Sequence, residues 1–353
     1  MDKYQKIVLD VLSNGTHEEN RTAEDTIADF GYHYSIDLSK GYPLLTTKEM
    51  DTFRWDSMLH EFEWYLSGDH HVQELTEKTG IWDAWADENN NLPSAYGRFW
   101  RRYPVPSEKT QLDGEAWITD DSKYTTRESN NGDSNLVFDQ LGFVVDALSG
   151  DNPYRGSESR RLIVNAWHPS NAQVSNLPPC HYTFVFNTQN GKLNTHLTQR
   201  SADIALGVPF NIAAYSLMTE LVAQQTGYDV GEFSHTLVDA HIYCGRDERS
   251  EWYSNNMGQL QEKIKNAESS EDYKNIRSWV LDNAPEDTGA GNVSEHKYGY
   301  DHVPGLLEQL SREPLGRSNL NISEGSTIDN ATYSDFNLEN YRSHGGLSFK
   351  VAE

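Results

Sequence analysis

Cys180 is a candidate nucleophile because it stands at the edge of a strand-forming segment. It lies in Pro178-Pro179-Cys180-His181, directly before a run of β-branched and aromatic residues, where a substrate could reach its sulfur. A reactive thiolate needs positive charge nearby, and the candidates are Arg160, Arg161 and Arg200. An inert buried cysteine is the competing interpretation. Neighbouring strand residues point to opposite faces, so His181 is poorly placed as a base for Cys180, which disfavours a cysteine hydrolase.

Glu61 is a candidate buried carboxylate. The apolar spacing from Phe53 to Leu66 predicts a helix with one buried face. Glu61 lies three residues after Met58 and four before Tyr65, so its side chain points with that face, whereas Glu63 points outward. It is either a structural partner of a core arginine or hydroxyl, or a carboxyl with a raised pKa that moves protons.

Two segments could bind an anion, and a third could bind a flat ring. Arg160-Arg161 precedes one strand-forming run and Arg200-Ser201 ends another, and guanidinium forks with a hydroxyl suit a phosphate. Ile81-Trp82-Asp83-Ala84-Trp85 places two indoles three residues apart, on one helical face. They could flank a heteroaromatic ligand or pack as a core pair.

Strands must position these residues. Strand-length runs extend over 161–167, 181–188 and 192–200, and Gln189-Asn190-Gly191 predicts a hairpin between the last two. In the returning strand, His196, Thr198 and Arg200 share one face, which suits a ligand cavity over a sheet.

A long core helix should follow this hairpin. The segment Gly207-Val208-Pro209-Phe210-Asn211 is expected to interrupt the chain before a helix from Ile212 to Thr226, which Gly227 ends. Strands and helices together indicate a mixed α+β class.

The composition limits the class of protein. The chain has 353 residues, of which 36% are hydrophobic, enough for a sizeable core. Its 29 Lys+Arg against 54 Asp+Glu give a formal net charge of −25. Such a field repels phosphate backbones, so we expect no DNA partner, and an anionic substrate would need a local arginine cluster. Self-repulsion of this size suggests a salt-rich cytoplasm, where screening relieves it.

The remaining patterns indicate one cytoplasmic domain. We find no apolar run long enough for a membrane span and no secretory signal. The two cysteines, Cys180 and Cys244, show no zinc-binding spacing, so no metal is expected, and Cys244 is interpreted as a buried hydrophobe. A single domain over 1–353 should carry two acidic, partly helical surface insertions, at about 107–135 and 246–301.

In their order along the chain, the motifs resemble the thymidylate synthase family. The segments that carry the resemblance are Tyr42 to Lys48, His60-Glu61 through Trp64 to Gly68-Asp69, Ile81 to Asn89, Tyr96-Gly97 with Trp100-Arg101, Ser159-Arg160-Arg161 with Ala166-Trp167, Leu177 to His181, Gln199 to Asp203, Leu206 to Asn211, His241-Ile242-Tyr243 and Leu310 to Pro314. They extend over nearly the whole chain and are interrupted only by the two insertions.

The resemblance implies a thymidylate synthase-like fold, with a large mixed sheet packed by helices, and a homodimeric methyltransferase. It implies methylation of dUMP to dTMP by 5,10-methylenetetrahydrofolate, giving dihydrofolate, with Cys180 attacking C6 of the uracil. The other catalytic residues that it implies are Glu61, Tyr96, His181, Asp203 and Asn211.

The resemblance also implies the binding residues. For dUMP these are Arg21, Gln199, Arg200, Ser201, Asp203, Asn211, His241 and Tyr243, with Arg160 and Arg161 donated by the other subunit. For the folate they are Lys48, Ile81, Trp82, Trp85, Leu177, Asp203, Gly207, Phe210 and Ala352.

Two positions bear on specificity. Asn211 points to uracil, because the related deoxycytidylate hydroxymethylases carry Asp there. Glu24 and Asp25 stand just after Arg21, where the family has a Gly/Thr-rich loop, and so place two acids beside a presumed phosphate ligand. The alternatives are a dUMP or pyrimidine-nucleotide hydroxymethylase of the same fold and a catalytically inactive binding dimer.

Overall fold

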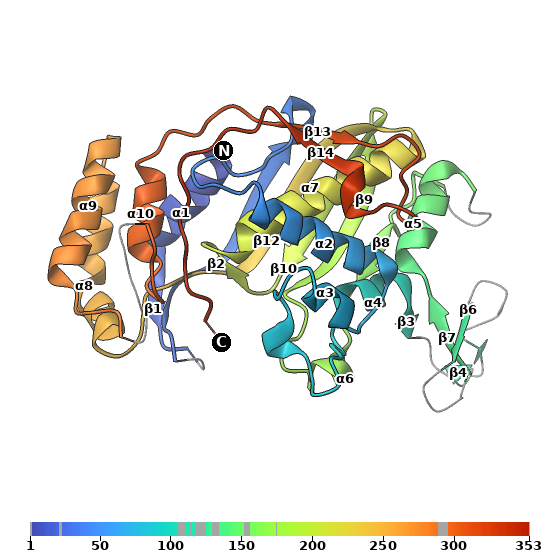
Figure 1. Cartoon of the computed structure of the whole chain (residues 1–353), viewed down its shortest axis with the longest axis horizontal. Coiled ribbons are helices and arrows are strands. Elements are labelled where there is room, and N and C mark those ends of the chain that lie inside the picture. The colour runs from blue at the N-terminus through green and yellow to red at the C-terminus, as the bar shows by residue number, and fades with distance from the viewer. Residues whose placement is uncertain are drawn as a thin grey trace.

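A seven-stranded mixed sheet is the frame of the molecule (Figure 1). The computed structural model describes residues 2–20, 23–104, 111–112, 115–116, 125–128, 134–151, 156–173, 175–288 and 296–352. The strand order is β1 (Thr16–Glu18), β2 (Thr26–Asp37), β12 (Asp229–Tyr243), β10 (Lys192–Gln199), β9 (His181–Gln189) and β8 (Ile163–Asn165), and β11 (Ala202–Asp203) pairs with β12. Strands β10 and β11 run parallel to β12, while the other pairs are antiparallel. The α+β prediction with a mixed sheet is therefore confirmed.

The predicted hairpin joins β9 and β10. Lys192 pairs with Gln189, which leaves the two-residue turn Asn190-Gly191. Both turn residues have positive φ, 53° and 76°, the conformation that Asn-Gly favours in tight hairpins. Alternate residues of β10 are buried, as the two-residue period of a strand requires.

Helices α7 (Gly207–Thr226) and α2 (Phe53–Ser67) lie in front of the sheet in Figure 1. Helix α2 has the predicted extent, and Gly68 ends it at a φ of 69°. Helix α7 begins at Gly207, so the expected interruption before Ile212 was wrong. The N–H groups of a helix's first turn have no acceptor within the helix, so Pro209 costs no hydrogen bond there.

Helix α4 (Tyr96–Arg101) crosses α2 closely. A Cβ atom on Gly97 would lie 2.1 Å from the backbone oxygen of Tyr65, so only glycine permits this approach. The crossing places the rings of Tyr65 and Tyr96 5.4 Å apart.

The second acidic stretch contains helices α8 (Asp247–Lys265) and α9 (Ser270–Asn283), which lie beside α1 (Asp2–Asn14) and α10 (Val303–Leu310) at one side of the sheet (Figure 1). It is anchored by more than apolar packing. The Ser250 hydroxyl of α8 donates to Asp25, and Arg277 of α9 pairs with Glu308 of α10. These helices therefore dock firmly on the body of the protein.

Short elements complete the described chain. Of the first acidic stretch, only parts are described, namely β4 (Gln111–Leu112), β5 (Glu115–Ala116), β6 (Thr125–Glu128) and the first residues of β7 (Ser134–Phe138). The others are η1 (Leu38–Lys40), α3 (Gln73–Thr76), η2 (Asp83–Trp85), β3 (Tyr103–Pro104), α5 (Gln140–Ser149), α6 (Pro169–Ala172), β13 (Asn319–Ile322), η4 (Tyr333–Asp335) and β14 (Phe336–Glu339). In the part of the chain that the structure describes, no helix is both long and apolar enough to cross a membrane.

Candidate active site

The site forms where strand ends meet above the sheet. Gln199 pairs with His181, and this places Cys180, just before β9, beside Arg200, just after β10. A register shift between Thr198 and Gln199 lies at this point, and such bulges redirect the side chains next to them. The pairing of Asp203 with His241 brings β11 and the end of β12 to the same edge.

Arg200 is fixed against the cysteine. Its Nε donates to Pro179 O at 3.0 Å and its Nη2 to Pro178 O at 2.7 Å. The same Nη2 lies 3.6 Å from the Sγ of Cys180. A guanidinium held at this distance favours the thiolate form of a cysteine.

An aromatic and imidazole stack lies beside the thiol. The ring of His181 lies parallel to that of Tyr96, with centroids 3.6 Å apart, and the Tyr96 hydroxyl oxygen accepts from the backbone N–H of Cys180 at 2.8 Å. His181 Nδ1 lies 2.7 Å from the Tyr215 hydroxyl. Burial lowers the pKa of His181 to about 3, so this imidazole is neutral at physiological pH and a poor general base.

Glu61 is buried, as predicted from its place on α2. Its side chain is 9% exposed, and its Oε1 accepts from the Tyr65 hydroxyl at 2.7 Å and from Trp82 Nε1 at 2.8 Å. Burial raises the pKa of Glu61, although the two hydrogen bonds oppose that effect. The result is a carboxyl that holds its proton to higher pH than an exposed glutamate.

The start of α7 supplies the next group. Asp203 Oδ1 accepts from the backbone N–H of Ala205 at 2.9 Å and of Leu206 at 3.2 Å, which fixes the turn into the helix. Asn211 follows one turn after Gly207 and lines the cavity. Among the described residues its amide makes no hydrogen bond, so both its donor and its acceptor can serve a ligand.

These residues line one cavity of about 1400 Å³. A pocket for one small ligand usually measures roughly 300–1,000 Å³, so there is space for two ligands. The expected residues that line the cavity are Glu61, Ile81, Trp82, Trp85, Tyr96, Leu177, Cys180, His181, Gln199, Arg200, Ser201, Asp203, Gly207, Phe210, Asn211, His241, Tyr243 and Ala352. Segments up to almost 300 residues apart in sequence therefore converge on one site.

The match to known proteins covers the chain from end to end. A model of the thymidylate synthase family matches residues 2–353. The chain is also 50% identical over 347 residues to the thymidylate synthase of the halophile Haloferax volcanii, which covers 98% of this chain and 95% of that protein. The chain belongs to the thymidylate synthase family. It is a methyltransferase of a family that uses a folate co-substrate.

Some residues expected at a thymidylate synthase site lie elsewhere. Lys48 is only 2% exposed, does not line the cavity, and donates from Nζ to Ala205 O at 2.6 Å. Its ammonium is held in the core, where burial lowers its pKa to about 7, so its role near the folate tail stays a prediction. Arg160 and Arg161 are exposed and lie outside the cavity of their own chain. Arg21 lies outside the described residues.

The two acids after Arg21 have partners in the thymidylate synthase structure. The carboxylate of Glu24 pairs with Arg246, and Asp25 Oδ2 accepts from the Ser250 hydroxyl at 2.5 Å. Because helix α8 and the residue before it engage both acids, neither is a bare charge beside the substrate.

Two tyrosines of the site escaped the sequence analysis as functional residues. Tyr65 and Tyr215 line the cavity and hydrogen-bond to Glu61 and His181, respectively. Their sequence signal was present but ambiguous, because a tyrosine on the apolar face of a helix usually fills the core. The indole pair also differs from a parallel clamp, since Trp82 and Trp85 pack edge to face with centroids 5.7 Å apart.

Proposed function

We propose that this enzyme methylates dUMP to dTMP with 5,10-methylenetetrahydrofolate, giving dihydrofolate. The observation that carries the proposal is the Cys180 thiol, which lies 3.6 Å from Arg200 in a cavity that also contains the buried Glu61 carboxyl. A nucleophile and a proton donor on one pyrimidine are what addition to an unreactive ring carbon requires.

Cys180 acts as the covalent nucleophile. Its thiolate adds to C6 of the uracil, and the π electron pair of the C5–C6 double bond moves toward C5 and O4, so C5 becomes nucleophilic. Arg200 favours the thiolate before addition, and the Tyr96 hydroxyl fixes the Cys180 backbone. At the end of the reaction Cys180 leaves as a thiolate while the C5–C6 double bond reforms.

Glu61 manages the protons. Its raised pKa suits a donor that supports charge at O4 during addition and then accepts a proton as C5 loses its own. Tyr65 and Trp82 hold Oε1 of this carboxyl in place. Oε2 has no hydrogen-bond partner among the described residues, so it is available to a ligand or water.

The nucleotide is recognised by polar groups that line the cavity. The Asn211 amide can accept from N3–H and donate to O4 of a uracil. His241 and Tyr243 lie with ring centroids 5.3 Å apart on the cavity wall, where they can hold the sugar hydroxyl. Arg200 and Ser201 bind the phosphate together with Arg21, and Gln199 and Asp203 complete the nucleotide site.

The other part of the cavity fits a reduced folate. Its lining includes apolar and aromatic side chains suited to a pterin ring, namely Ile81, Trp82, Trp85, Leu177 and Phe210, with Ala352 from the C-terminus. Asp203 and Gly207 lie where they can contact the ring's polar edge. When bound, the folate supplies the one-carbon unit and the hydride.

The active form is a homodimer that uses Arg160 and Arg161 across the interface. Both arginines are exposed and outside their own cavity, so the phosphate site of one subunit gains them only from another. A single catalytic domain over 1–353, with the two acidic insertions, and a cytoplasmic location belong to the same proposal.

Product analysis tests this function. The protein is incubated in high-KCl buffer with dUMP and 5,10-methylenetetrahydrofolate, and the nucleotide and the folate product are identified by mass in the same sample. We expect dTMP with dihydrofolate. Hydroxymethylated nucleotide with tetrahydrofolate would instead identify a hydroxymethylase. Unreacted dUMP with folded protein would support the alternative of a catalytically inactive binding dimer.

A further inference from the structure

The C-terminal tail, residues 348–352, docks on the segment that follows helix α9, here called the docking segment, residues 296–302. Tyr298 N–H donates to Ser348 O at 2.8 Å, Ser348 N–H to His296 O at 3.0 Å and Lys350 N–H to Gly299 O at 3.1 Å. The next two residues of the tail line the active-site cavity. The position of the docking segment therefore sets the position of the tail at the cavity.

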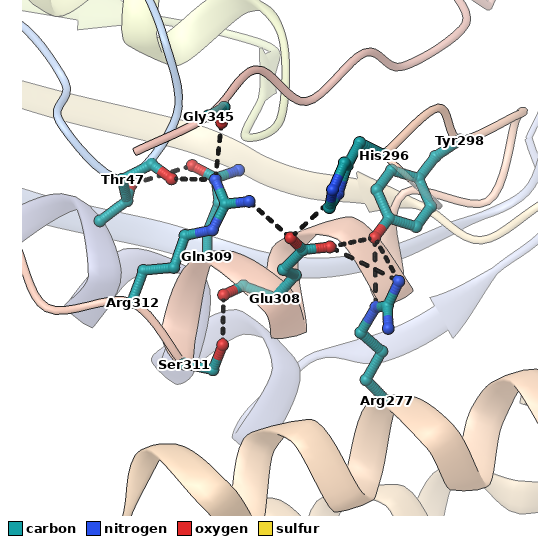
Figure 2. A network of polar contacts seen from close by, with 9 residues as sticks. All are labelled: Thr47, Arg277, His296, Tyr298, Glu308, Gln309, Ser311, Arg312 and Gly345. Atoms are coloured by element: carbon teal, nitrogen blue, oxygen red, sulfur yellow. Dashed lines mark hydrogen bonds and ion pairs between the residues drawn. The ribbon is translucent and has the colours of Figure 1, made fainter. Parts of the chain in front are cut away.

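An arginine of helix α9 holds the first tyrosine of the docking segment (Figure 2). Arg277 donates from Nε at 3.1 Å and from Nη2 at 3.0 Å to the Tyr298 hydroxyl oxygen, which donates in turn to Glu308 of α10 at 2.5 Å. The Tyr298 ring stacks on Phe349 of the tail, with centroids 5.6 Å apart and planes 22° from parallel. One phenol thus connects the insertion to the tail.

The residue before helix α8 contacts the second tyrosine of the docking segment. The Arg246 guanidinium lies 3.8 Å from the centroid of the Tyr300 ring, and Lys350 Nζ of the tail lies 4.4 Å from the same centroid. Arg246 also pairs with the buried Glu24, so the contact continues to the loop after the proposed phosphate ligand.

Helix α9 does not need Arg277 for its own packing. Ile276 and Val280 of α9 are 5% and 0% exposed and anchor the helix in the core. The Arg277 guanidinium instead contacts Tyr298 of the docking segment and Glu308 of α10. Its removal should therefore loosen the docking segment while α9 stays folded.

We propose that the α8–α9 insertion positions the C-terminal tail, with Arg277 and Arg246 holding the tyrosines on which Phe349 and Lys350 dock. Arg277 and Tyr298 are positioning residues in this proposal, because neither lines the cavity. The part that concerns turnover rests on the proposed function. A better-held tail keeps Val351 and Ala352 over the folate and excludes water from the reaction.

The test compares Arg277→Ala, Arg277→Lys and Tyr298→Phe with Lys274→Ala, a control on the same helix whose exposed ammonium pairs with Glu271. Hydrogen exchange at the amides of Ser348 and Lys350 measures tail docking without any turnover. Steady-state kinetics then give the KM for the folate, the kcat, and the Kd for dUMP alone.

We expect Arg277→Ala and Tyr298→Phe to speed tail exchange and to raise the folate KM about tenfold, with the dUMP Kd unchanged. Arg277→Lys should retain part of the tail docking, with smaller changes in exchange and in the folate KM, and Lys274→Ala should resemble the wild type. Should Arg277→Ala fail to fold, Tyr298→Phe removes one oxygen and keeps the ring stack.

Unchanged exchange in Tyr298→Phe and in folded Arg277→Ala would overturn the proposal, as would faster exchange with an unaltered folate KM. A wild-type protein that made no thymidylate would refute the proposed function, while the exchange rates would still decide whether the insertion holds the tail.

Discussion

Arg200 shows how one residue can serve structure and chemistry together. Two of its nitrogens bond the carbonyl groups of Pro178 and Pro179, so its charge is immobilised 3.6 Å from the Cys180 sulfur. A fixed charge needs no rearrangement when the thiolate forms. The guanidinium can only donate, so the carbonyl oxygens of the two prolines are suitable acceptors for it.

Cys180→Ser should reduce kcat by at least about 10⁴-fold, because a neutral hydroxyl cannot replace the thiolate as a nucleophile. The assay is dTMP formation at saturating dUMP and folate. Cys244→Ala is the matched control, since that thiol is 0% exposed, lies outside the cavity lining and should be dispensable for turnover. A Cys180→Ser enzyme with near-normal turnover would disprove the covalent mechanism.

Glu61→Gln should lower kcat/KM by about 10²- to 10⁴-fold and change its pH profile. Because burial raises the pKa of Glu61, the carboxyl stays protonated above the usual range of glutamate, and donation toward O4 weakens as the pH rises through that raised pKa. The wild-type fall in kcat/KM toward high pH should therefore be absent in Glu61→Gln. Glu63→Gln, two residues along the same helix, should still show this fall. If the fall persists in Glu61→Gln, another group causes it.

At the scale of elements, local patterns predicted most of the frame. Asn190-Gly191 fixed the hairpin, and the spacing in α2 placed Glu61 inside, because both signals depend on neighbours in sequence. The start of α7 was missed because glycine and proline, here Gly207 and Pro209, usually interrupt helices. The first turn of a helix nevertheless tolerates both residues.

Residue patterns alone singled out Cys180, Arg200 and Glu61, but the site as a whole could be predicted from sequence only through the resemblance. The approach of Cys180 to Arg200 depends on the pairing of two strands, and the burial of Lys48 depends on the distant Ala205 carbonyl. Local periodicity predicts neither contact, and the approach of Cys180 to Arg200 depends on the register of the sheet.

Helix α7 carries a further titratable group, Glu220, whose pKa burial raises to about 7. The folded state therefore binds this proton more tightly than the unfolded chain, so its contribution to stability is present below about pH 4.5 and is lost as the pH rises to about 7. Glu220→Gln should remove this loss and stabilise the protein at pH 8 by about 1–3 kcal/mol.

Denaturant unfolding at pH 5 and pH 8 measures that effect. The control is Glu248→Gln, on the exposed side of α8, which should leave the pH dependence unchanged. If wild type and Glu220→Gln lost equal stability between the two pH values, Glu220 would not be the group responsible.

At the scale of the whole molecule, the net charge of −25 predicts that salt stabilises the fold. The Debye length falls from about 10 Å at 0.1 M to about 3 Å at 1 M, which removes most repulsion between exposed carboxylates. Surface ion pairs also weaken, but each contributes only about 0–1 kcal/mol. The Tm should therefore rise between 0.1 M and 1 M KCl, and an unchanged or falling Tm would argue against salt adaptation.

Subunit mixing tests the proposed site shared between two subunits. Cys180→Ser and Arg161→Ala homodimers should each have little activity, the first because it lacks the nucleophile and the second because each site lacks a phosphate ligand from its partner. In a mixed dimer, the subunit that keeps Cys180 receives an intact Arg161 from the other chain. One of the two sites is then complete.

Random exchange makes half of the dimers mixed, so activity should recover to about a quarter of the wild-type value. The recovery is measured by dTMP formation after the two variants are unfolded together and refolded in high KCl. Mixing Cys180→Ser with Glu61→Gln serves as the control. The structure places these two residues in the same cavity, so neither site of a mixed dimer is intact and no activity should recover. One intact site would form only if the two residues acted in different subunits. If neither mixture recovers while Arg161→Ala is inactive, Arg161 acts in its own subunit's site and the reason for a shared site is gone. Recovery in the control would contradict the placement of Cys180 and Glu61 in one cavity.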